Sequence, residues 1–184
     1  LNDGFFEMFG EAVGTLHRLT KSYHPKHKRY HFYEEDFIDM GKRSLGKEHQ
    51  YVIDRSVEVV EKIKGYEQTI DSYGLIHTDL HFGNMYYDGS ELTFFDFDDA
   101  CYKHFISDIA IIIFYSFGMG PLTDTEIEDR TIQFLISFMK GYEKENHLDV
   151  LWFQDYSSSF IDAGDMTISS VLWIAPCCKS LLTL

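Results

Sequence analysis

Most residues that could do chemistry lie in two short stretches near the middle of this 184-residue chain. The first reads His-Thr-Asp-Leu-His-Phe-Gly-Asn over residues 77–84, and the second reads Phe-Phe-Asp-Phe-Asp over residues 94–98. They carry three side chains with oxygen donors, namely Asp79, Asn84 and Asp96. An oxygen-only set suits Mg²⁺, which proteins usually hold through one or two groups together with substrate phosphates, and it suits Zn²⁺ poorly.

A turn signal between the two stretches predicts that they meet. Asp88-Gly89 is typical of a β-hairpin turn, so we expect one hairpin with strands at about 84–88 and 92–97. In such a hairpin Asn84 and Asp96 lie together at the open end, beside the loop that carries Asp79. The three oxygen-bearing side chains should therefore converge.

The first stretch has the spacing of a kinase catalytic loop, His-x-Asp-x-x-x-x-Asn. In that loop the Asp accepts the proton of the substrate hydroxyl, the Asn holds Mg²⁺, and a later Asp-Phe-x holds the bridging metal ion. The order of motifs resembles the aminoglycoside phosphotransferase and choline kinase-like family of small-molecule kinases. That family has a His-Gly-Asp-Leu-His-Pro-Gly-Asn loop, a hairpin, an Asp-Phe/Trp-Asp/Glu turn and a helix opening with Asp-Leu-Ala, here Asp108-Ile109-Ala110. Thr78 replaces the usual Gly of the loop, and Phe82 replaces the frequent Pro.

The resemblance implies a role for each matching residue. Asp79 would be the catalytic Asp, and Asn84 and Asp96 would bind Mg²⁺ and with it the nucleotide. His77 and Asp108 would brace the catalytic loop through hydrogen bonds. The implied reaction moves the γ-phosphate of Mg-ATP to a hydroxyl group of a small molecule, such as an aminoglycoside, an aminoalcohol or a homoserine-like compound.

Helical periodicity and capping signals place this site among helices. Apolar residues recur at helical spacing over residues 5–19 and 51–72, with Gly74 as the expected stop, and residues 106–117 are apolar almost all round, as in a buried helix. A capping-box pattern from Thr123 to Glu126 opens a further helix that runs to Tyr142. The expected fold class is α+β: a protein kinase-like C-terminal lobe, mostly helical, with a small β-hairpin that carries the metal site.

Two expectations about domain organisation follow from the resemblance, which covers roughly residues 5–146. Residues 1–150 should form the C-terminal, catalytic lobe, because the chain has no glycine-rich phosphate-covering strand pair and no Val-Ala-Ile-Lys-like strand of an N-terminal, ATP-clamping lobe. Residues 151–184 should be a divergent or altered tail of the same lobe. Such a fragment would grip nucleotide weakly and be inactive alone. A non-catalytic kinase-like binding module is therefore the alternative function.

Composition excludes several other classes of partner. The formal net charge is −14, so nucleic acid and anionic membrane surfaces would be repelled. The longest apolar stretches, residues 109–114 and 171–175, are far shorter than a membrane-spanning helix. Three cysteines, two of them adjacent at Cys177 and Cys178, do not suggest a disulfide framework, so we expect a cytoplasmic protein and read the adjacent pair as small apolar residues.

The acceptor is the least defined partner. A cluster of acidic residues follows an aromatic loop: Glu34, Glu35, Asp36 and Asp39. This cluster would attract a cationic acceptor, although it would equally serve to solubilise the surface.

The histidines outside the two stretches have simpler interpretations. His24, His27 and His31 lack the partners of a Zn²⁺ site, which favours a solvated loop. His17 and His104 are expected to be structural histidines with satisfied hydrogen bonds.

Overall fold

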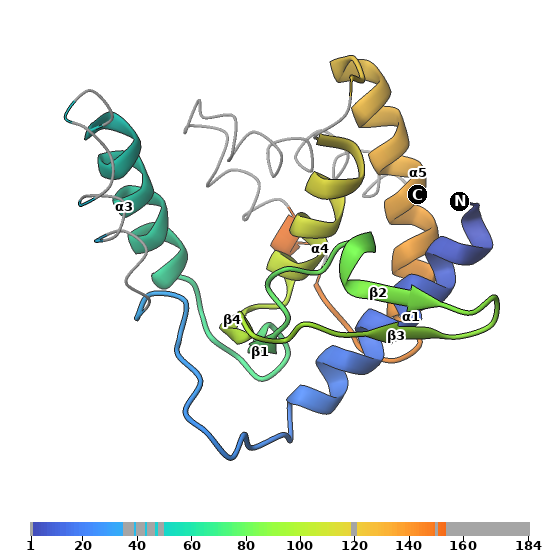
Figure 1. Ribbon diagram of the computed structural model, residues 1–184, viewed down its shortest axis with the longest axis horizontal. Coiled ribbons are helices and arrows are strands. Elements are labelled where there is room, and N and C mark those ends of the chain that lie inside the picture. Colours follow the sequence, from blue (N-terminus) through green and yellow to red (C-terminus); the bar gives the residue numbers. More distant parts are fainter. Residues whose placement is uncertain are drawn as a thin grey trace.

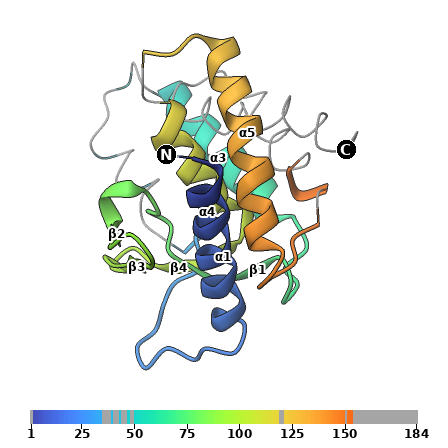
Figure 2. The same ribbon diagram turned by 90° about the vertical axis from the view of Figure 1, so that its right-hand side faces the viewer.

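Two helices that are distant in sequence lie side by side and form the frame of the molecule (Figures 1 and 2). In the computed structural model, which describes residues 2–34, 50–118, 121–149 and 151–153 and the single residues 39, 43 and 47, these helices are α1 (Asp3–Thr20) and α5 (Asp124–Tyr142). The two helices approach closely at Gly10, which has no side chain. A Cβ atom there would lie 1.8 Å from the carbonyl oxygen of Phe138. The helix expected over residues 5–19 is confirmed.

A third helix, α4 (Ile106–Ile113), is buried beside this pair, which explains its apolar sequence. It is shorter than the 106–117 helix expected, because residues 114–118 continue it as a π-helical turn, η3 (Phe114–Gly118). The α5 helix begins as predicted. Thr123 accepts a hydrogen bond from the Glu126 backbone, and the Glu126 carboxylate accepts one from the Thr123 N–H at 2.9 Å.

Two small antiparallel sheets complete the architecture. One pairs β1 (Tyr73–Ile76) with β4 (Cys101–His104), and the other pairs β2 (Met85–Tyr87) with β3 (Leu92–Phe94). The second pair is the expected hairpin, with shorter strands: Met85 faces Phe94, and the Phe95 N–H donates to the carbonyl of Asn84 at 3.1 Å. The described residues thus show the mixed helical and β character that was predicted.

The helix expected over residues 51–72 ends early. Helix α3 spans Gln50–Lys64, and the Gly65 N–H closes it by donating to the carbonyls of Glu61 and Lys62. Gly74 is not a helix stop. It lies in β1, where a Cβ atom would come within 2.8 Å of the Phe105 ring. In Figure 1, α3 stands on the opposite side of the molecule from α1 and α5.

The core is dominated by aromatic and β-branched side chains. Buried members come from α1, α4 and α5, from the loop before η2 (Phe82–Asn84) and from the N-cap of α4: Phe9, Leu80, Phe105, Ile109, Phe134 and Phe138. Among the described helices, none combines the length and the apolar character that a bilayer crossing requires. Most of the expected tail, residues 154–184 with both adjacent cysteines, lies outside the described residues, as do Glu35 and Asp36 of the acidic cluster.

Candidate active site

Asp79 and Asn84 are in direct contact at the start of the hairpin. The Asn84 side-chain amide donates hydrogen bonds to both the main-chain carbonyl and the carboxylate Oδ2 of Asp79, each at 2.9 Å. Asn84 belongs to η2, a 3₁₀ turn capped by His81, whose Nδ1 accepts from the Gly83 N–H at 2.9 Å. The turn buries Asn84 while the Asp79 side chain stays 36% exposed. The loop thus presents a carboxylate whose position is fixed by a buried amide.

Asp96 lies one step beyond the hairpin ladder, next to Phe95, which pairs with Asn84. Its backbone has φ = 65°, in the left-handed region that non-glycine residues seldom adopt. The residue is exposed. The backbone pairing therefore places Asn84, which contacts Asp79, at the end of the hairpin from which the Asp96 turn leaves, as the turn signal predicted.

Asp108 accepts hydrogen bonds from the backbone at the start of the loop over residues 77–84. Its Oδ2 accepts the His77 N–H at 3.0 Å and its Oδ1 accepts the Thr78 N–H at 2.8 Å. The His77 ring reaches in another direction, and its Nε2–H donates to the carbonyl of Phe95 at 2.9 Å. Asp108 thus accepts hydrogen bonds from the loop backbone, and His77, which belongs to the loop, donates one to a residue outside it. His77 ties the loop to the turn that carries Asp96.

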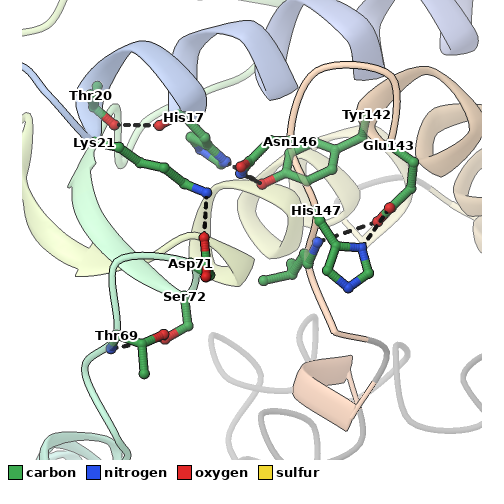
Figure 3. Close-up of polar contacts among 11 residues, drawn as sticks. His17, Thr20, Lys21, Thr69, Asp71, Ser72, Tyr142, Glu143, Asn146 and His147 are labelled. Atoms are coloured by element: carbon green, nitrogen blue, oxygen red, sulfur yellow. Dashed lines mark hydrogen bonds and ion pairs between the residues drawn. The ribbon is translucent and has the colours of Figure 1, made fainter.

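A buried chain of hydrogen bonds supports Asp108. Figure 3 shows its three other members, His17, Tyr142 and Asn146. The His17 Nε2–H donates to Asp108 Oδ2 at 3.1 Å, and the Tyr142 hydroxyl donates to His17 Nδ1 at 2.8 Å. Asn146 completes the chain by donating its amide hydrogen to the Tyr142 oxygen, also at 2.8 Å. Burial raises the pKa of Tyr142 above its usual value, so this group stays a neutral hydroxyl. We refer to these four residues, His17, Asp108, Tyr142 and Asn146, as the buried relay.

The relay is the part of the site that the sequence did not reveal. His17 was expected to be structural with its hydrogen bonds satisfied, which the structure confirms, but Tyr142 and Asn146 were not linked to it. Tyr142 comes at the end of an apolar helical stripe and His17 lies within the first helix, so each could have signalled a buried polar position. Their pairing across 125 residues could not be seen before the fold was known.

Two further side chains surround the Asp79 carboxylate. His81 Nε2 lies 3.4 Å from Asp79 Oδ2, and the His81 ring lies 4.6 Å from the ring of Tyr115. Burial and the negative charge of Asp79 raise the pKa of Tyr115. Tyr115 belongs to η3, and π-helical turns are frequent at functional sites. Neither the turn nor the contact was predicted from the sequence.

His104 corrects an expectation. It is fully buried, yet neither ring nitrogen makes a hydrogen bond within the part of the chain that the structure describes. Aromatic rings surround it instead, with centroids at 4.8 Å for Trp152 and 4.9 Å for Tyr73. Burial lowers the pKa of His104 to about 4. It is a structural histidine, but not a satisfied one, because β4 places it inside an apolar cage.

The donor set of the site fits a hard cation. The Asn84 amide nitrogen is committed to Asp79, which leaves its carbonyl oxygen for a metal ion, and Asp96 adds an exposed carboxylate. Over residues 2–34, 50–118, 121–149 and 151–153, no three His, Cys, Asp or Glu side chains are placed to hold a metal together. Mg²⁺ is compatible with so few protein ligands because substrate phosphates and water complete its octahedron.

Comparison with known proteins shows where this arrangement belongs. A sequence model of the phosphotransferase enzyme family matches residues 2–146, a span that contains every residue of the site. The chain belongs to the phosphotransferase enzyme family. Within this family, it is 32% identical over 154 residues to the amicoumacin kinase of Bacillus subtilis (strain 168), covering 82% of the chain and 46% of that kinase.

Solved structures extend the comparison to the fold. The complex of amicoumacin kinase hAmiN with AMP-PNP, Ca²⁺ and Ami matches with a TM-score of 0.74 and 30% identity, covering 98% of this chain and 59% of that one. A microcompartment-associated aminopropanol kinase matches with a TM-score of 0.60 and 19% identity, covering all of this chain and 63% of its own. The fold is therefore kinase-like. The chain spans about half the length of the curated relative that it matches.

Proposed function

We propose that this chain is the catalytic part of an ATP-dependent small-molecule kinase, which transfers the γ-phosphate of Mg-ATP to a hydroxyl group of its acceptor. One observation carries the proposal. Asp79 and Asn84, which have the spacing of a kinase catalytic loop, are hydrogen-bonded to each other at the end of the hairpin from which the Asp96 turn leaves, on a backbone that Asp108 holds with two hydrogen bonds. Membership of the phosphotransferase family supports the same conclusion.

Each residue has a defined part in the proposed reaction. Asp79 accepts the proton of the acceptor hydroxyl as its oxygen bonds to the γ-phosphorus, while the bond from that phosphorus to the bridging oxygen breaks and ADP leaves. Asn84 and Asp96 hold the metal ion with their carbonyl and carboxylate oxygens. Mg²⁺ bound there would offset the negative charge of the phosphates. His77 and Asp108 keep the two loops at a fixed separation through their bonds to Phe95 and to the catalytic-loop backbone.

The proposed domain organisation follows the same logic. Residues 1–150 form the C-terminal lobe, with residues 151–184 as its divergent tail, and a separate ATP-clamping lobe belongs to the complete enzyme. Because phosphoryl transfer depends on that clamp, we expect the isolated chain to bind nucleotide weakly and to turn over slowly or not at all. We expect the complete enzyme to act in the cytoplasm.

An amine-bearing hydroxyl compound is the proposed acceptor class. The charge of −14 attracts cations over the whole surface. Close to the site, the exposed carboxylates of Asp98 and Asp99 follow Asp96 and add to this attraction. Neutral sugars carry no positive charge and gain nothing from this attraction.

A binding and transfer experiment on the complete protein tests this function. AMP-PNP affinity is measured by calorimetry with and without Mg²⁺ for the wild type, for Asp96→Asn and for the control Glu91→Gln, whose exposed residue lies at the turn end of the hairpin, just before β3. Removing the metal ligand should weaken Mg²⁺-dependent binding at least about tenfold, while the control keeps wild-type affinity.

Transfer is then followed with labelled ATP and a panel of amine-bearing and neutral hydroxyl compounds. The proposal predicts labelled product with at least one amine-bearing acceptor. Mg²⁺-dependent binding without transfer to any hydroxyl would instead identify a non-catalytic binding module. Equal affinity of Asp96→Asn and wild type would remove the metal assignment.

A further inference from the structure

Thr78 occupies an unusual backbone conformation next to the proposed catalytic base. Its φ is 70°, and within the described residues only Thr78 and Asp96 are non-glycine residues with positive φ. A β-branched residue is strained in this region, which glycine enters freely. Thr78 also stands where the motif of the resembling family has glycine. A side chain at this point therefore calls for a compensating interaction.

The compensating interaction is a hydrogen bond that crosses between the two loops of the site. The Thr78 hydroxyl donates to the carbonyl of Asp99 at 2.8 Å, while its N–H donates to Asp108 Oδ1 at 2.8 Å. Asp99 lies three residues after Asp96. The hydroxyl thus joins the catalytic loop to the segment that leaves the turn carrying Asp96, and a glycine could not make this bond.

A second bond joins the same loops on the other side of Asp96. The His77 ring donates to the carbonyl of Phe95 at 2.9 Å, immediately before Asp96. The two bonds come from adjacent residues of the catalytic loop and bracket the Asp96 turn. Asp96 depends on such support because its own backbone is in the left-handed region and its side chain is exposed.

We propose that Thr78 is a positioning residue whose hydroxyl clamps the Asp96 turn against the catalytic loop. The clamp fixes the separation between the Asp79 and Asp96 carboxylates, and so the place of the metal ion relative to the base. This inference rests on the proposed phosphotransfer function for its kinetic consequence. Its structural part, the clamp itself, is independent of that function.

Three variants of the complete protein separate the clamp from general stability. Thr78→Gly relieves the backbone strain and removes the hydroxyl, Thr78→Ser keeps the hydroxyl, and Thr78→Val keeps the branched shape without it. A residue with a merely structural role would move activity and melting temperature together. The clamp predicts that Thr78→Gly keeps or raises the melting temperature, while the Mg²⁺ concentration for half-maximal turnover rises about threefold to tenfold.

Amide hydrogen exchange over residues 95–100 reads the clamp directly, whether or not the protein transfers phosphate. We expect exchange about tenfold faster in Thr78→Gly and Thr78→Val than in the wild type, with protection and Mg²⁺ response largely restored in Thr78→Ser. Wild-type exchange in Thr78→Gly, or a serine variant no better than glycine, would overturn the clamp. A wild type without transfer activity but with faster exchange in Thr78→Gly would overturn the proposed function and leave the clamp intact.

Discussion

The buried relay and the acidic residues Asp79 and Asp96 of the same site differ in their exposure to solvent and in how they are hydrogen-bonded. His17, Asp108 and Tyr142 are fully buried, and each of their side-chain polar groups has a hydrogen-bond partner. Asp96, in contrast, is exposed and has a backbone in the left-handed region, and the half-buried Asp79 side chain remains 36% exposed. The comparison teaches that the fold uses its buried polar groups to fix a loop backbone, which leaves the exposed carboxylates available to ligands.

The buried charge of Asp108 is tolerable because of its surroundings. An ionised carboxylate in an apolar core is costly unless hydrogen bonds replace its lost hydration. Asp108 accepts three such bonds, from the backbone of His77 and Thr78 and from the His17 ring. Removing this carboxylate should harm folding, whereas removing an exposed one should harm only chemistry.

The largest expected effect on stability comes from breaking the relay at its charge. In Asp108→Asn one oxygen acceptor becomes an amide donor, which leaves buried N–H groups without partners. We expect the free energy of unfolding of the complete protein to fall by about 3–5 kcal/mol, measured by urea denaturation. Asp129→Asn, an exposed acid on α5, should change it by less than about 0.5 kcal/mol. Equal effects of the two substitutions would refute the contrast.

A smaller loss should follow from separating the helices that carry the relay. A Cβ atom on Gly10 would lie 1.8 Å from a backbone oxygen of α5, and backbone cannot move aside without displacing the helix. We expect Gly10→Ala to destabilise the protein by about 2–3 kcal/mol.

The matched control uses the same substitution in the same helix. Gly4 has only the Asn2 side chain near its added Cβ, at 3.5 Å, so Gly4→Ala should be neutral or stabilise by up to about 1 kcal/mol. Thermal melts of both variants decide the point. Similar melting temperatures would mean that α1 and α5 are not tightly apposed.

The smallest effect concerns His104, a buried histidine without the partners that His17 has. Because its folded pKa of about 4 lies below the unfolded value near 6.5, the unfolded state binds more protons between these values. Stability should therefore decline as pH falls from about 6.5 towards 4, by at most on the order of 3 kcal/mol from this residue.

Replacing the ring isolates that contribution. His104→Phe fits an aromatic cage and removes two unpaired nitrogens, so it should stabilise the protein by about 1–2 kcal/mol at pH 7. The gap between variant and wild type should widen at pH 5 in urea titrations. A gap that stays constant with pH would show that His104 does not titrate as described.

The sequence was sufficient to predict the parts of the site that depend on local spacing. The hairpin, the convergence of Asn84 and Asp96, and the capping box at Thr123 all rest on signals within about ten residues. They were predictable because turn and cap chemistry is set by neighbouring residues.

Features that depend on tertiary contacts were missed or misplaced. The β1–β4 pair joins segments that the whole β2–β3 hairpin separates along the chain, and the relay links α1 to the segment that contains α5 and Asn146. The helix expected over residues 51–72 ends at Lys64, just before Gly65. The prediction was too long because the apolar spacing continues past this glycine. The strain at Thr78 was signalled only by its replacing a family glycine, which shows that such a departure can mark a real backbone constraint.

The most direct test of the account is Asp79→Asn in the complete protein, with turnover and unfolding measured on the same samples. The variant keeps an oxygen that can accept the Asn84 hydrogen bond but loses the base, so turnover should fall by about 10²–10⁴-fold. The free energy of unfolding should fall by no more than about 1 kcal/mol, because an acceptor oxygen remains for Asn84. Near-normal turnover, or a loss of stability comparable to that of Asp108→Asn, would contradict the division between a buried frame and the proposed catalytic carboxylate of Asp79.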